Sequence, residues 1–193
     1  MGSARFEETV VYHCSPALVG LKSACLISLA AEQYPGLASM VEGYRAALEG
    51  RGIRFELLCR CDRRFLLLVY RPALLERHLA RPEVDRLLVQ AGYPAEGPLS
   101  GRLAYLRRRL TAAGGFPHEI GLFLGYPAED VRAFQARGGA GCKLCGYWKV
   151  YHDVEEARRQ FRRFDRCRDS LLARLRAGMT LSQLFGVSGT LAA

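Results

Sequence analysis

The sequence predicts an α+β domain in which a small sheet of three or four strands is covered by several helices. Residues 53–61 alternate apolar and polar side chains with a period of two, which is typical of a strand. After a short turn, residues 65–70 return as a more fully apolar strand. Residues 154–177 instead repeat their apolar side chains at helical spacing, which indicates one long amphipathic helix packed on the core.

The N-terminal third is expected to contribute one more strand and two helices. Residues 9–13, rich in β-branched side chains, are predicted to be a strand. Ser15 and Pro16 suit the first turn of a largely apolar helix that would run to about residue 33. A second helix is expected over 37–49, ended by the glycine-rich turn that follows.

The remaining elements follow from proline, glycine and capping signals. Asp153, with Glu156 three residues later, forms a capping box for the long C-terminal helix. The other expected elements are short helices from Pro72 and Pro82, a basic amphipathic helix over 99–112, short helices on each side of 125–127, a strand over 147–151 and a short helix over 180–185.

Length and composition indicate a globular chain. It has 193 residues, of which 50% are hydrophobic and 24% charged, so residues 1–193 are expected to form a single domain. A subdivision would fall in the loop at 92–98. Charged residues interrupt every apolar stretch that could span a membrane, and the first residues lack the basic-then-apolar order of an export signal. We therefore expect a cytoplasmic protein.

The net charge of +9 raises the hypothesis of a nucleic-acid partner. All but three of the basic residues are arginines, and they are spread over several predicted helices rather than gathered in one segment. Residues 118–135 resemble a helix-turn-helix, but Glu129 and Asp130 would open the recognition helix and face the phosphates. Two packed helices are the favoured interpretation, and nucleic-acid binding stays an alternative.

Seven cysteines in a chain without an export signal indicate free thiols rather than a disulfide framework. Cys59 and Cys61 share one face of the predicted strand at 53–61 with its large apolar side chains, so both are expected in the core.

Cys14 is the candidate nucleophile. It lies where the predicted strand passes into a helix, and the amides and dipole at such a position favour a thiolate. His118 and Glu119, which follow Pro117 at a helix start, are candidates for an acid–base pair. The alternative is a buried cysteine and a histidine that caps a helix.

A second set of residues is expected to bind a ligand. Strand alternation puts Tyr147, Lys149 and Tyr151 on one face and Trp148 on the core face. Lys22 and Lys149 would hold an anionic group, while His13, whose side chain would point away from Cys14, joins the same candidate set. A plain polar sheet surface is the alternative.

Cys142 and Cys145 have the two-residue spacing of dithiol redox centres and of half a zinc site. Because the sequence contains no second such pair, a bound zinc or iron would need further ligands from His13, His152 or Cys167. A metal-binding or redox-accessory module with a redox protein partner is therefore a second hypothesis, beside a simple loop or core role.

Three ordered motifs carry a resemblance to a known family. They are residues 13–16 with Lys22, residues 116–121 with 124–127, and residues 146–151. Over almost the whole chain the sequence resembles a bacterial family catalogued as domain of unknown function 3793. The resemblance implies a single-domain cytoplasmic protein, a source among anaerobic bacteria, and three motifs that belong together; it implies no activity.

The leading functional hypothesis combines these motifs in one pocket for a small anionic ligand. In this pocket the sulfur of Cys14 is reachable by solvent, His118 and Glu119 act as the acid–base pair, and Lys22 and Lys149 bind the ligand.

Overall fold

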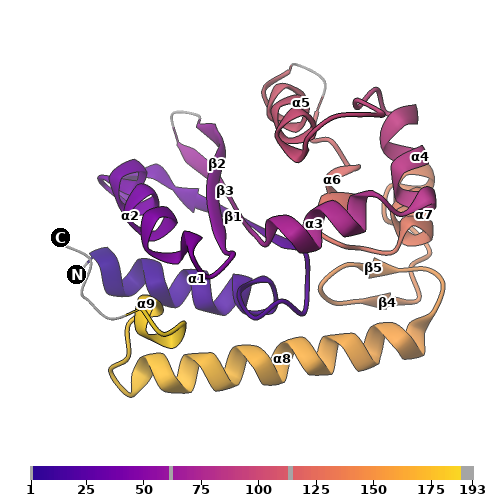
Figure 1. Ribbon diagram of the computed structural model, residues 1–193. Coiled ribbons are helices and arrows are strands. Elements are labelled where there is room, and N and C mark those ends of the chain that lie inside the picture. Colours follow the sequence, from indigo (N-terminus) through magenta and orange to yellow (C-terminus); the bar gives the residue numbers. More distant parts are fainter. Residues whose placement is uncertain (1, 61–62, 113–114, 188–193) are drawn as a thin grey trace.

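The computed structural model describes residues 2–60, 63–112 and 115–187 and has the predicted α+β class (Figure 1). Its elements are α1 (Gly2–Leu18), β1 (Ala24–Ala30), the 3-10 helix η1 (Ala31–Gln33), α2 (Leu37–Glu49), β2 (Arg54–Arg60), β3 (Arg64–Tyr70), α3 (Pro72–Leu79), α4 (Pro82–Gln90), α5 (Leu99–Thr111), α6 (Ile120–Phe123), α7 (Ala128–Arg137), β4 (Leu144–Cys145), β5 (Lys149–Val150), α8 (Val154–Arg176) and α9 (Leu181–Leu184).

An antiparallel sheet with the strand order β1-β3-β2 divides the core into two apolar clusters. One face packs against α1 and α2, with α8 and α9 completing that cluster. The other face packs against α3, α4, α5, α6 and α7. Alternate residues of each strand enter opposite clusters, as the pleat requires: Leu67 and Val69 of β3 lie in the first, and Leu68 and Tyr70 lie in the second.

The strand predicted at residues 9–13 is wrong, because these residues lie inside α1. Phe6, Val10 and Cys14 follow one another at four-residue spacing and are all fully buried. This stripe is typical of a helix packed on a sheet. Burial of the stripe therefore outweighs the weak strand preference of the β-branched residues.

The helix predicted from Pro16 to residue 33 is also wrong. Pro16 lies in the last turn of α1, and Gly20, with φ of 80°, turns the chain out of the helix. Residues 24–30 then form β1, whose Cys25, Ile27 and Leu29 enter the first apolar cluster. A short apolar run can be a strand or a buried helix, and periodicity alone does not separate the two.

A bulge in β2 corrects the position expected for Cys59. Leu57 pairs with Leu67, but Cys59 pairs with Leu66, so one residue is inserted between them. Because Leu66 and Leu67 point to opposite faces, Cys59 lies on the face opposite Leu57. Cys61 lies outside the described residues.

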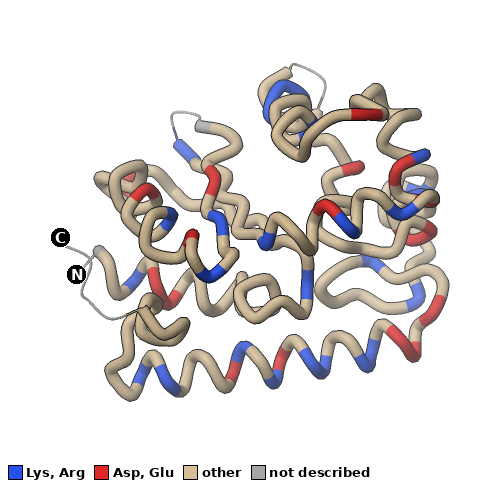
Figure 2. The backbone as a smooth tube through the Cα atoms, in the orientation of Figure 1, with Lys and Arg blue, Asp and Glu red and all other residues tan. Residues whose placement is uncertain are grey.

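The helices predicted over 37–49, 99–112, 154–177 and 180–185 are confirmed within a residue or two as α2, α5, α8 and α9. Those expected from Pro72, from Pro82 and on each side of 125–127 are confirmed as α3, α4, α6 and α7. The side chain of Asp153 accepts a hydrogen bond from the Glu156 amide and caps α8, which runs beneath both α1 and the β4–β5 hairpin (Figure 1). Helix α8 carries both acidic and basic residues, with arginines in the majority (Figure 2). Within the described part of the chain, no helix combines the length and the apolar character needed to cross a bilayer.

The side chain of Arg71, which follows β3, is hydrogen-bonded to the end of α1 and to the turn before β2. It therefore joins three segments of the chain. Its Nε lies 3.2 Å from the carbonyl oxygens of both Ala17 and Leu18, at the C-terminal end of α1. Its Nη1 donates to the carbonyl of Arg51, 3.1 Å away, in the turn before β2. The guanidinium thus adds donors at the end of α1, where carbonyls lose their intrahelical partners; the Ala17 carbonyl also accepts from the Gly20 amide. Burial lowers the pKa of Arg71 from its ordinary value.

We expect Arg71→Ala to lower the free energy of unfolding by about 2–3 kcal/mol, since charge-assisted hydrogen bonds to partly buried carbonyls are lost. Arg71→Lys should recover only part of this, because an ammonium cannot reach both segments. Urea denaturation measures the effect. Arg45→Ala, which removes an exposed ion pair with Glu42 on α2, is the control and should change stability by less than about 0.5 kcal/mol.

Candidate functional site

Three hollows adjoin where the α1–β1 connection, the α6–α7 turn, the β4–β5 hairpin and α8 meet. The connection packs tightly on the turn: Ser23 Oγ donates to the carbonyl of Phe123, 3.2 Å away. Gly125 has φ of 74°, and a Cβ at this position would lie 2.8 Å from Ser23 Oγ. Only glycine allows this approach without strain.

Asp130 at the start of α7 anchors the hairpin. Its buried carboxylate accepts hydrogen bonds from Trp148 Nε1 at 2.8 Å, from the Tyr151 amide at 2.8 Å and from the His152 amide at 3.2 Å. Three N–H donors offset much of the cost of burying the charge. The position of Trp148 therefore depends on this carboxylate.

Aromatic side chains fix the hairpin on α8. The Trp148 ring meets Phe161 edge-on at 4.6 Å and stacks on Tyr126 at 5.4 Å. Gly146 lies against Phe161 so closely that a Cβ would lie 2.3 Å from the ring. The predicted alternation holds over 147–150, where Trp148 and Val150 are buried and Tyr147 and Lys149 half-buried, but Tyr151 is buried as well, and β5 covers only Lys149 and Val150.

We call the first hollow the thiol pocket. Its volume is about 210 Å³. The residues that line it are Tyr12, His13, Lys22, Cys25, Leu26, Leu124, Tyr126, Tyr147 and Arg168. The pocket brings together three of the predicted ligand-binding residues, His13, Lys22 and Tyr147, which lie far apart in the sequence.

Lys22 carries the uncompensated charge of the thiol pocket. Arg168 is held by Asp165 at 2.9 Å and by Asp169 at 3.2 Å, so its charge is balanced. Burial lowers the pKa of His13, which keeps its imidazole neutral near pH 7. Lys22 Nζ lies 4.7 Å from the centre of the Tyr126 ring, in a cation–π contact.

The position expected for Cys14 is wrong, and Cys25 is the thiol of the pocket. Cys14 is 0% exposed in the middle of the first apolar cluster, and burial raises the pKa of its thiol. Cys25 on β1 is 5% exposed and lines the pocket. A hydrogen bond from the Cys14 thiol and the charge of Lys22 lower the pKa of Cys25.

In the structure, neither His118 nor Glu119 lies beside Cys14. Their own side chains contact different partners. Glu119 is buried and accepts hydrogen bonds from Arg109 Nε at 2.9 Å and Tyr93 Oη at 3.4 Å. His118 is exposed and its ring packs on Phe134 at 5.0 Å. The expected triad of Cys14, His118 and Glu119 is therefore not assembled.

The two remaining ligand-binding candidates lie apart from the thiol pocket. Lys149 lines the largest apolar hollow, and its Nζ donates to the carbonyl of Gly139, 3.3 Å away. Tyr151 is buried, with the guanidinium of Arg137 at 5.5 Å from its ring centre.

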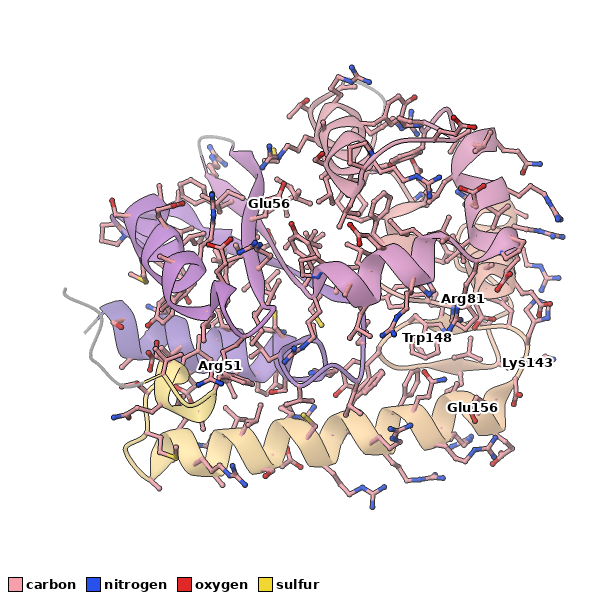
Figure 3. The ribbon with its side chains drawn as sticks, in the orientation of Figure 1. Arg51, Glu56, Arg81, Lys143, Trp148 and Glu156 are labelled. Atoms are coloured by element: carbon pink, nitrogen blue, oxygen red, sulfur yellow. The ribbon has the colours of Figure 1, made fainter. Side chains whose placement is uncertain are left out.

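The second hollow, which we call the cationic cleft, has a volume of about 280 Å³ and lies on the other side of Lys22. Arg81, from the α3–α4 turn, and Arg163, from α8, line it with Lys22, and Arg81 lies beside Trp148 (Figure 3). Among the described residues, no carboxylate lies within ion-pair distance of these three cations. Neither arginine carries a local sequence signal, so only the tertiary fold identifies them as residues of this cleft.

His78 adds an unsatisfied atom to the cationic cleft. It lines the cleft, and its buried Nε2 has no hydrogen-bond partner among the described residues. Burial and the nearby charge of Arg81 lower the pKa of His78, so the ring is neutral near pH 7.

The Cys142–Cys145 pair lies on the β4 side of the hairpin, with Cys142 half-buried and Cys145 exposed. His152, a ligand considered for this pair, lies 3.7 Å from Glu129 instead. Across the described ranges, no three His, Cys, Asp or Glu side chains gather in a way that could hold a metal ion.

The helix-turn-helix resemblance at 118–135 corresponds to α6 and α7. Helix α6 has only 4 residues, and the first turn of α7 directs Asp130 into the protein, where it holds the hairpin. The start of the would-be recognition helix is therefore used for packing.

Comparison with known families shows which family the chain belongs to. A family model described as protein of unknown function (DUF3793) matches residues 10–185. The chain belongs to this family. The three motifs that carry the resemblance all lie within the matched range, and they supply residues to all three hollows. Neither the curated proteins nor the solved structures contain a significant match.

We expect a small alkylating reagent to modify Cys25 and to spare Cys14, because only Cys25 reaches a pocket wall. The rate should rise with pH around a midpoint below the value of about 8.5 for a free cysteine. Lys22→Gln removes a charge that favours the thiolate and should move this midpoint upward. Peptide mass spectrometry after iodoacetamide pulses at several pH values measures both effects.

Lys143→Gln, which removes an exposed lysine of the hairpin, is the matched control and should leave the rate at Cys25 unchanged. Modification of Cys14 as fast as Cys25 would contradict the assignment.

We expect Asp130→Ala to lower the free energy of unfolding by about 3 kcal/mol, because three buried N–H groups lose their acceptor. Asp130→Asn keeps one acceptor oxygen and should cost less. Trp148 is the single tryptophan, so its fluorescence during urea denaturation reports on the site directly. Glu129→Ala, the exposed neighbour, is the control with an effect below about 0.5 kcal/mol.

Proposed function

We propose that this protein is a cytoplasmic binding protein for a small anionic ligand, which the cationic cleft holds and to which Cys25 presents a reactive thiol. The observation that carries the proposal is the convergence of Lys22, Arg81 and Arg163 on one hollow without an acidic partner among the described residues. Glu156 of α8 lies within electrostatic reach of Arg163, but its carboxylate is already held by Arg159 and Gln160.

Like charges around one hollow repel each other and destabilise the fold, and a bound anion removes this cost. The three cations come from the α1–β1 connection, the α3–α4 turn and α8, so an anion would also join these segments. A hollow of about 280 Å³ is large enough for a phosphate ester or a pyrophosphate group. Arginine forks suit such oxyanions because they donate two parallel hydrogen bonds.

Lys22 connects the cationic cleft to the thiol pocket, since its side chain lines both. A ligand whose anionic group binds at Lys22 would therefore extend toward Cys25. His13 lines the same pocket and is neutral near pH 7, so it is the candidate proton acceptor there. The six cysteines that the structure describes are free thiols, which supports a reducing, cytoplasmic compartment.

We expect inorganic pyrophosphate to bind the wild-type protein saturably at constant ionic strength, as measured by isothermal titration calorimetry. Arg163→Gln should weaken binding by about 10-fold or more, which corresponds to one lost charge-assisted contact. Arg162→Gln removes the same charge from the neighbouring, exposed position of α8 outside the cleft and should change binding less than about 2-fold.

Two results would contradict the proposal. One is the absence of saturable heat with phosphate, pyrophosphate and sulfate. The other is an equal loss in Arg162→Gln and Arg163→Gln, which would indicate a diffuse polyanion interaction such as nucleic-acid binding.

A further inference from the structure

The third hollow, which we call the apolar cavity, is the largest space beside the hairpin that has mainly apolar walls. Its volume is about 420 Å³, which is within the range of small-molecule sites. Its walls come from α6, α7, the segment before α6, and β5 with Trp148. The apolar and aromatic side chains that line it are Phe116, Ile120, Leu124, Tyr126, Val131, Phe134 and Trp148.

Lys149 gives this cavity a positive side, and His118 adds a polar ring to its wall. Lys149 lines it, and its Nζ contacts a backbone carbonyl; no carboxylate of the described residues lies within ion-pair distance. His118 lines it beside Phe134. Asp130 is the acidic residue of the wall, but its oxygens already accept three hydrogen bonds. The cavity therefore favours a negative group near Lys149.

The mouth of the cavity has an exposed aromatic side chain. Phe116 is 51% exposed, although burial of a phenylalanine is strongly favourable in water. A planar ligand between Phe116, Phe134 and Trp148 would cover it and would make the stacked contacts that aromatic rings favour.

An aromatic wall separates the apolar cavity from the other two hollows. Trp148 lines both this cavity and the cationic cleft, and Tyr126 lines both this cavity and the thiol pocket. The two rings stack at 5.4 Å, and Lys22 lies against Tyr126 from the thiol-pocket side. The cavity thus shares this aromatic wall with the other hollows but has a cation of its own, Lys149.

We propose that the apolar cavity is a second binding site, for a planar aromatic molecule that carries one anionic group, with the rings among Phe116, Phe134 and Trp148 and the anion at Lys149. This site goes beyond the proposed phosphate-type ligand of the cationic cleft and does not depend on it.

A matched pair of dyes tests the proposal on the whole 193-residue chain. The dye 1-anilinonaphthalene-8-sulfonate carries a sulfonate, and N-phenyl-1-naphthylamine has the same rings without it. Both should bind the wild-type protein with one dye per chain and quench Trp148 by energy transfer. Lys149→Gln should weaken binding of the sulfonate dye by about 10-fold and binding of the neutral dye by less than about 2-fold. Phe116→Ala should weaken both.

Lys143→Gln, on the exposed side of the same hairpin, is the control and should change neither affinity. Arg163→Gln and saturating pyrophosphate should likewise have no effect on either dye, which separates this site from the cationic cleft. The proposal is wrong if neither dye binds, if several dyes bind per chain, or if Lys143→Gln acts like Lys149→Gln. Displacement of the sulfonate dye by pyrophosphate would also overturn it.

Discussion

The buried carboxylate of Asp130 is the contact on which the candidate functional region depends. It accepts hydrogen bonds from one indole N–H and two backbone N–H groups of the hairpin, with each nitrogen within 3.2 Å of a carboxylate oxygen. Water would otherwise accept these bonds. Because β4 and β5 have only two residues each, their own ladder cannot hold the hairpin in place. An ionised acceptor in a nearly closed environment is a strong and directional restraint. It determines where Trp148 lies, and Trp148 forms part of both the cationic cleft and the apolar cavity.

The stacked rings of Tyr126 and Trp148 allow a cationic environment and an apolar one to lie close together. An aromatic face attracts a cation and also packs against apolar atoms. Lys22 lies against Tyr126 on the thiol-pocket side, while the cavity on the other side is largely apolar. A wall of aliphatic side chains would offer Lys22 no such contact. The aromatic residues of the second and third motifs are therefore explained by the wall that they form together.

The elements that could be predicted from the sequence are those in which local helix or strand preference agrees with the pattern of buried side chains. Amphipathic spacing and capping residues define α8, and prolines at the first turn define α3 and α4. The errors fall where local preference opposes packing. Residues 9–13 have strand preference, but α1 buries a continuous stripe against the sheet and α8. Residues 24–30 are too short and too apolar for their periodicity to decide between helix and strand. The site residues Arg81, Arg163 and Asp130 could not be predicted, because only the tertiary fold brings them to the hairpin.

The correction at the first motif follows from helix geometry. Successive residues of a helix are rotated by about 100°, so His13 and Cys14 point in different directions, as they would in a strand. In a helix, however, residues four apart lie on the same face. Cys14 is therefore buried in the core together with Phe6 and Val10. Cys25, in the same apolar cluster, lines the pocket beside Lys22. The first motif thus reaches the pocket through His13 and Lys22, while Cys14 packs in the core and its thiol helps to lower the pKa of Cys25.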